Sequence, residues 1–179
     1  TIPTLTLRPR TALLSCGKSP LKFGHSKTKT MLNEDYSEIL RALSRNKAKF
    51  LVVGAYAMGI YGYPRATGDF DIFVEPSVEN SQKIYKSLQE FGAPLKDITE
   101  KTFHEEGIIF QIGVAPRRID LITQIDGVTF KDAYTRKKLV KIENLCIPFL
   151  SKSDLIKNKE STGREKDKLD VKYLRQKKL

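Results

Sequence analysis

The chain has 179 residues, of which 40% are hydrophobic and 30% are charged, and it contains no Trp. This length suits one domain with its own hydrophobic core, and the composition excludes a disordered or fibrous chain. Lys and Arg number 32 against 21 Asp and Glu, which gives a net charge of +11, and no apolar stretch is long enough to cross a bilayer.

The positive charge is concentrated at the two ends of the chain. Residues 1–30 hold six basic residues and no acid, whereas residues 151–179 hold ten basic and five acidic residues. Residues 1–30 also lack helical or strand periodicity. We therefore expect residues 1–30 to be a basic extension, either disordered or an artefact, and residues 31–179 to form a single domain with a helical C-terminal part from about 151.

The cysteine content indicates a reducing compartment. Cys16 and Cys146 are the only cysteines, so the chain has no disulfide framework and no zinc-ligand spacing. Because no apolar signal-peptide core is present either, we expect a cytoplasmic protein.

Helices and strands alternate in the first half of the domain. Asn33 is a typical N-cap, and the spacing of the apolar residues after it predicts a helix. The apolar run at 50–53 predicts a buried strand that ends at Gly54. The elements expected next are a short helix at 55–61, a loop at 62–68, a strand at 69–74, and a helix capped by Ser77 that runs to about residue 90.

Strands and then helices are expected in the second half. The predicted strands lie at 108–112, 118–123, 139–142 and 146–149, and the predicted helices start at 151 or 153 and at 165, with a break at 162–163. This order predicts an α+β domain with a mixed β-sheet and helices mainly on one face.

Two acids in the strand at 69–74 are the first sign of chemistry. Asp69 and Asp71 are separated by one residue, so their carboxylates project from the same face of the strand. Asp120 is a further acid in an apolar strand, and a neighbouring position in the sheet would bring it to the pair. Three carboxylates are typical ligands of a hard divalent cation. Asp120 has an alternative role as an ion-pair partner of Arg117 or Arg118.

A glycine turn upstream offers a place for phosphate groups. Gly54 ends a strand and precedes a helix that starts with Ala55 and Tyr56, so backbone N–H groups are available to an anion. An ordinary strand-ending glycine is the alternative interpretation. Carboxylates that hold Mg²⁺ beside a phosphate site form the usual arrangement for phosphoryl transfer.

These motifs resemble those of a known superfamily. The runs Val53-Gly54-Ala55-Tyr56-Ala57 and Gly62-Tyr63-Pro64-Arg65-Ala66-Thr67-Gly68-Asp69-Phe70-Asp71-Ile72 are similar to the DNA polymerase β-like nucleotidyltransferases. The chain resembles in particular small prokaryotic members related to minimal nucleotidyltransferases and abortive-infection toxins. The resemblance extends from about Leu43 to Leu174. It implies the nucleotidyltransferase fold, Mg²⁺ or Mn²⁺ at Asp69, Asp71 and Asp120, and the phosphates of an NTP such as ATP at the Gly54 turn.

The chain departs from the superfamily at the turn itself. Many relatives have Gly-Ser or Gly-Gly there, whereas this chain has Gly54-Ala55 and so lacks a hydroxyl for a phosphate. Three cations are candidates to bind the nucleotide: Arg65, Lys159 and Arg164. Arg65 has the alternative of an ion pair with a nearby acid, and the lysines and arginines of the C-terminal helices have the alternative of a solvated face.

The leading functional hypothesis is a nucleotidyltransferase that transfers an NMP to a hydroxyl of a protein, RNA or small molecule. One alternative is an interaction protein of a toxin–antitoxin pair, in which partner binding matters more than catalysis. The other is a nucleic-acid-binding module that uses the basic residues of 151–179, whose interleaved acids make it the weakest of the three.

Overall fold

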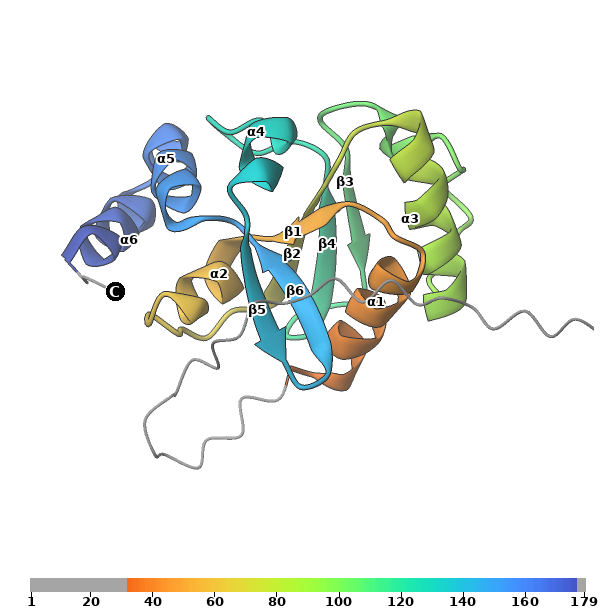
Figure 1. The fold of residues 1–179 in the computed structure, drawn as a ribbon, viewed down its shortest axis with the longest axis horizontal. Coiled ribbons are helices and arrows are strands. Elements are labelled where there is room, and N and C mark those ends of the chain that lie inside the picture. Colours follow the sequence, from red (N-terminus) through yellow and green to blue (C-terminus); the bar gives the residue numbers. More distant parts are fainter. Residues whose placement is uncertain (1–31, 177–179) are drawn as a thin grey trace, which may run out of the picture.

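The computed structural model describes residues 32–176. The expected basic extension at 1–30 lies outside these residues. Within them, the predicted α+β fold with a mixed sheet is confirmed (Figure 1).

The strands form one six-stranded sheet in the described part of the chain, in the order β3-β4-β2-β1-β6-β5. Two neighbouring pairs are parallel, β2 with β4 and β1 with β6. The other neighbours are antiparallel. Each strand ends within one residue of its predicted bounds: β1 Phe50–Val52, β2 Asp69–Val74, β3 Ile109–Ile112, β4 Arg118–Ile122, β5 Lys138–Ile142 and β6 Leu145–Phe149.

Two long helices, α1 (Glu34–Arg45) and α3 (Val78–Phe91), pack against each other on one face of the sheet (Figure 1). Their predicted caps are present, because Asn33 and Ser77 each accept a hydrogen bond from a backbone N–H of the first turn. The ring of Tyr36 in α1 stacks on Phe70 of β2, with 4.6 Å between ring centroids. Because side chains alternate along a strand, the residues on either side of Phe70 point to the opposite face.

The remaining predicted helices are α2 (Gly54–Ile60), α5 (Lys152–Thr162) and α6 (Glu165–Gln176). The short helix α2 follows β1, and the C-terminal helices α5 and α6 lie side by side at the end of the molecule opposite α3 (Figure 1). Gly163 separates α5 from α6 in a left-handed conformation, as the predicted break requires.

Two short elements were not predicted. They are the 3-10 helix η1 (Thr102–His104) and helix α4 (Phe130–Thr135). Each is too short to display a helical period in the sequence, which explains why they were missed. In residues 32–176, no helix has both the length and the apolar character that a membrane span requires.

Candidate metal and nucleotide site

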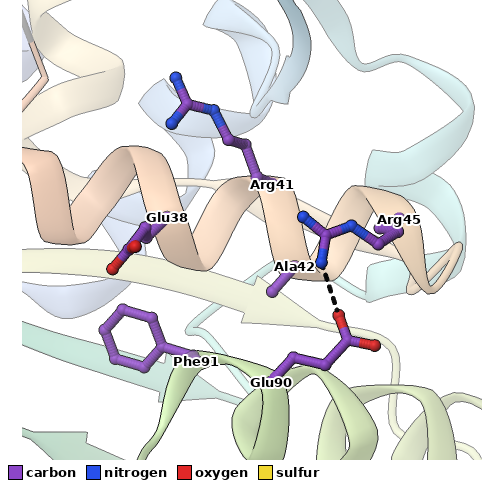
Figure 2. Close-up of a pocket in the computed structure, with 6 residues that line it drawn as sticks. All are labelled: Glu38, Arg41, Ala42, Arg45, Glu90 and Phe91. Carbon is purple, nitrogen blue, oxygen red and sulfur yellow. Dashed lines mark hydrogen bonds and ion pairs between the residues drawn. The ribbon is translucent and has the colours of Figure 1, made fainter.

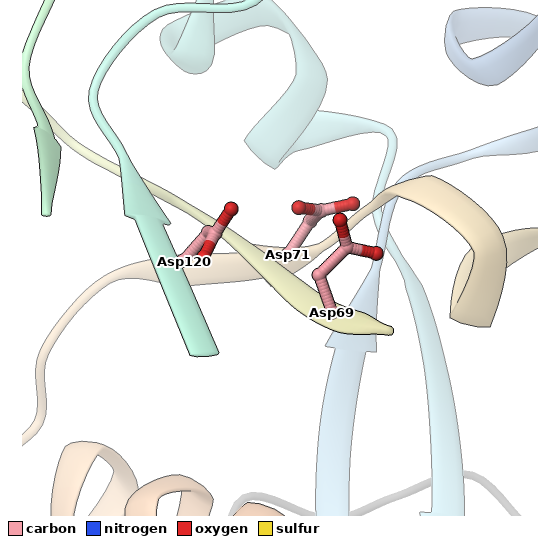
Figure 3. Close-up of side chains that lie close together, drawn as sticks. All are labelled: Asp69, Asp71 and Asp120. Atoms are coloured by element: carbon pink, nitrogen blue, oxygen red, sulfur yellow. The ribbon is translucent and has the colours of Figure 1, made fainter. Parts of the chain in front are cut away.

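Four charged side chains form a square on the sheet face opposite Phe70. In the parallel pair of β2 and β4, Asp69 lies beside Arg118 and Asp71 lies beside Asp120. Residues two apart in a strand share a face, so the register brings three acids and one arginine together. Figure 3 shows the three carboxylates gathered above the two strands. The ligand atoms that these acids offer all lie within 4.8 Å of one another.

Arg118 holds two of the three acids. It donates hydrogen bonds from Nε to Asp120 Oδ1 (2.7 Å), from Nη2 to Asp120 Oδ2 (2.9 Å) and from Nη2 to Asp69 Oδ2 (3.1 Å). Gln111 on β3 also donates to Asp120, and Thr67 donates to Asp69 Oδ1 at 2.5 Å. The sequence indicated Arg118 only as an alternative partner of Asp120, although its spacing of two residues from Asp120 already placed both on one face.

Asp71 is the acid that Arg118 does not contact. Burial, together with the negative charges of Asp69 and Asp120, raises the pKa of Asp71 from 3.8 to about 6, although Arg118 and Lys159 act in the opposite direction. A carboxylate kept in such surroundings costs stability in the protein alone. A hard divalent cation offsets this cost, so the donor set and its charge fit Mg²⁺ or Mn²⁺.

The Gly54 turn lies directly against Asp71. Gly54 has a φ of +63°, and a Cβ at this position would lie 2.1 Å from Asp71 Oδ2. The neighbouring Val53 N–H donates to the backbone carbonyl of Asp71 at 3.0 Å. Glycine is therefore required both by the left-handed backbone and by the carboxylate beside it.

We expect Gly54→Ala to lower stability more than Gly92→Ala. The matched control is Gly92→Ala, because Gly92 also has a positive φ (+79°) but a Cβ added to it would have no atom within 4 Å. Both variants bear a left-handed backbone penalty of about 1–2 kcal/mol, and the clash with Asp71 adds about 1–3 kcal/mol in Gly54→Ala. Urea denaturation measures both, and equal losses would contradict the close approach of Gly54 to Asp71.

The side chain of Tyr56, in the turn after Gly54, takes part in packing. The ring of Tyr56 packs edge-on against Tyr36 (5.6 Å between centroids) and Phe70 (4.8 Å). Burial raises the pKa of its hydroxyl, in keeping with a packing role for the side chain. Phosphate binding at Gly54, Ala55 and Tyr56 stays a prediction.

The three cations proposed for the nucleotide all make ion pairs with acids of α6. Arg65 Nη1 lies 2.8 Å from Asp170 Oδ1, which is the ion pair considered as its alternative role. Lys159 Nζ lies 2.7 Å from Asp167 Oδ1 and 2.8 Å from Asp170 Oδ2, and only 6% of its side chain is exposed. Arg164 Nε lies 2.6 Å from Asp167 Oδ2. Lys159 is therefore not on a solvated face, although its contact with a nucleotide stays a prediction.

A shallow pocket between α1 and α3 lies away from this square. Figure 2 shows Glu38 and Arg45 of α1 on the side of Glu90 and Phe91 of α3, whereas the Arg41 side chain extends away from them; Arg45 and Glu90 form an ion pair of 3.2 Å. These helices cover the Phe70 face of the sheet, whereas the acids project from the other face. The pocket therefore takes no part in the candidate site.

Comparisons with known proteins identify the fold. No family model and no curated protein matches the sequence. Among solved structures, the chain is similar to a Thermotoga maritima protein provisionally assigned as a nucleotidyltransferase, with 18% identity and a TM-score of 0.54 over 85% of this chain and 100% of the other. The chain therefore has a nucleotidyltransferase-like fold, as the motifs implied.

Proposed function

We propose that this protein is a metal-dependent nucleotidyltransferase that transfers an NMP from an NTP to a hydroxyl group. The observation that carries the proposal is the meeting of Asp69, Asp71 and Asp120 on adjacent parallel strands, beside a glycine turn. The likeness of the fold to a provisionally assigned nucleotidyltransferase supports it. Three acids held together in a partly buried square are costly for structure alone and useful for binding cations.

In this proposal Asp69, Asp71 and Asp120 hold Mg²⁺ or Mn²⁺. When bound, the metal polarises the α-phosphate and activates the attacking hydroxyl oxygen. A new bond then forms between that oxygen and the α-phosphorus, the bond to pyrophosphate breaks, and the hydroxyl proton leaves to solvent. The acids orient the reacting groups, and Arg118 keeps Asp69 and Asp120 in place through its hydrogen bonds.

The nucleotide side of the site is proposed at the backbone of Gly54, Ala55 and Tyr56. Lys159 supplies positive charge near the acids, since it lowers the pKa of Asp71 against the stronger effect of burial. We propose further phosphate contacts from Arg65 and Arg164, made by the donor atoms that their aspartate partners leave open.

The proposal also covers the subgroup of nucleotidyltransferases, the acceptor of the NMP and the cellular compartment. Resemblance to abortive-infection toxins favours a cytoplasmic enzyme whose acceptor is RNA or a protein, with a partner protein as a further candidate. We do not propose a nucleic-acid-binding module instead, because four of the basic residues of the C-terminal helices are paired with acids. These pairs are Lys159 with Asp167, Arg164 with Asp167, Lys168 with Glu165 and Arg175 with Glu160.

A transfer assay tests the proposal. The full chain is incubated with each α-³²P-labelled NTP and Mg²⁺ or Mn²⁺, together with RNA, with protein, or with small hydroxyl compounds. We expect label to move to one acceptor class and pyrophosphate to be released, and we expect both to be lost in the double variant Asp69→Asn, Asp71→Asn. If wild type neither binds an NTP nor transfers label, or if the double variant behaves like wild type, the proposal is wrong.

A further inference from the structure

The loop at residues 62–68 connects the metal carboxylates to the C-terminal helix. It runs from α2 to β2, and its last residues lead directly into Asp69. Pro64, Arg65 and Ala66 in its middle are exposed. Loops with exposed middles are the parts of a fold that need tertiary contacts to hold one conformation. A contact that fixes this loop therefore bears on the position of Asp69.

Contacts with α6 supply that support. Arg65 Nη1 lies 2.8 Å from Asp170 Oδ1, and the Asp170 side chain is only 6% exposed. Tyr63 stacks on Tyr173 one turn further along α6, with 5.3 Å between ring centroids. Because Asp170 and Tyr173 are three residues apart on a helix, they share the face that meets the loop.

Asp170 also makes an ion pair with Lys159 of α5. Lys159 of α5 places its Nζ 2.8 Å from Asp170 Oδ2 and 2.7 Å from Asp167 Oδ1. The acid therefore lies between a buried lysine and the arginine of the loop. An ion pair with one buried partner loses little freedom on forming and is screened less than a surface pair.

At the end of the loop, Thr67 forms a hydrogen bond with Asp69. Its Oγ1 donates to Asp69 Oδ1 at 2.5 Å, so the hydroxyl sets the orientation of one carboxylate. Groups that hydrogen-bond to a metal ligand typically change metal affinity by about 10–100-fold when they are removed. The residue that contacts α6, Arg65, and the residue that contacts Asp69, Thr67, are therefore two positions apart in the same loop.

We propose that Arg65 is a positioning residue, which with Thr67 and Asp170 fixes Asp69 in the arrangement that binds the metal. This inference rests on the metal site of the proposed function. It differs from a phosphate contact by Arg65, because positioning affects metal binding without any nucleotide.

Titration with Mn²⁺ alone, followed through the electron paramagnetic resonance of free Mn²⁺, tests the inference on the full chain. We expect Arg65→Met and Thr67→Val each to weaken Mn²⁺ binding by at least about tenfold, and Thr67→Ser to restore most of it. The direction of the change in Mn²⁺ affinity is informative for Arg65→Met. Removing a positive charge near a cation site would by itself strengthen Mn²⁺ binding, so weaker binding indicates loss of positioning. Arg175→Met is the charge-matched control, because Arg175 pairs with Glu160 of α5, and we expect its affinity to stay within about twofold of wild type.

The results that differ from these expectations each contradict a specific claim. If Arg65→Met binds Mn²⁺ as wild type does, the inference is wrong, and a loss confined to NTP binding would leave Arg65 with only the phosphate contact of the proposed function. Should Arg65→Met fail to fold, Asp170→Asn removes the same ion pair from the other side and is expected to show the same tenfold loss; wild-type affinity in it would overturn the inference. If wild type itself binds no Mn²⁺, the proposed function fails together with the inference.

Discussion

Replacing Asp71 by Asn is expected to stabilise the protein in the absence of metal by about 2–3 kcal/mol at pH 8. Burial and the charges of Asp69 and Asp120 raise the pKa of Asp71 from 3.8 to about 6, and each pKa unit corresponds to about 1.4 kcal/mol. An amide of the same shape avoids the cost of the charge. A site residue whose removal stabilises the fold is typical of an active site.

The pH dependence of this gain follows from the direction of the shift. Well below pH 4 the carboxyl is protonated in both the folded and the unfolded chain, so the charge costs nothing. As the pH rises from about 4 to 6, the unfolded chain ionises first and the folded state loses stability; above 6 the full cost remains. The advantage of Asp71→Asn should therefore grow between pH 4 and pH 6 and stay constant above it.

Urea denaturation at pH 4 and pH 8 measures this prediction, with Asp154→Asn as the control of opposite sign. Burial raises the pKa of Asp154, but hydrogen bonds from Arg136 and Ser151 outweigh burial and lower it. Arg136 donates two of these bonds, at 2.7 and 3.1 Å. Asp154→Asn should therefore cost about 2 kcal/mol at pH 8. A loss of stability in Asp71→Asn as well would contradict the unfavourable environment of the Asp71 carboxylate.

Lys159→Met is expected to give the largest loss of stability, about 3–5 kcal/mol. The variant leaves Asp167 and Asp170 buried without the lysine between them, and breaking a buried ion pair from one side costs about this much. Burial raises the pKa of Asp167, yet hydrogen bonds from Lys159, Thr162 and Arg164 lower it to about 2. The stability that these bonds contribute is present above about pH 4 and is lost as the pH falls toward 2.

The matched control for this variant is Lys168→Met in the neighbouring helix. Lys168 also pairs with a carboxylate, that of Glu165, but both side chains are mostly exposed, at 64% and 86%. Exposed pairs contribute about 0–1 kcal/mol, so Lys168→Met should melt close to wild type. If thermal unfolding shows similar small losses for both variants, Lys159 is not the buried anchor of α5 and α6.

Much of the fold could be predicted because its signals are local. The apolar run at β1, the alternation in β2 and the caps Asn33 and Ser77 each predict one element without knowledge of the rest. Helix α4 gave no such signal, since its six residues hold less than two turns.

The site could be predicted only in part. Asp69 and Asp71 share a face by spacing alone, whereas the place of Asp120 beside Asp71 depends on which strands pair. The roles of Arg65 and Lys159 depend on how α6 packs, because their acidic partners lie in that helix. Asp170 is 105 residues after Arg65, and Asp167 is 8 residues after Lys159. A long-range ion pair has no signature in the local sequence, so the sequence left the role of Arg65 open.

Calorimetric titration of each NTP with Mg²⁺ into the full chain, and into the double variant Asp69→Asn, Asp71→Asn, is the decisive experiment for the proposed site. We predict binding by wild type with a dissociation constant between about 1 μM and 1 mM, the usual range for enzyme substrates, and no binding by the double variant. Thermal unfolding of the variant in the same buffer shows whether it is folded. Absence of NTP binding by wild type, or equal binding by both proteins, would contradict the assignment of Asp69, Asp71 and Asp120 as a metal–nucleotide site.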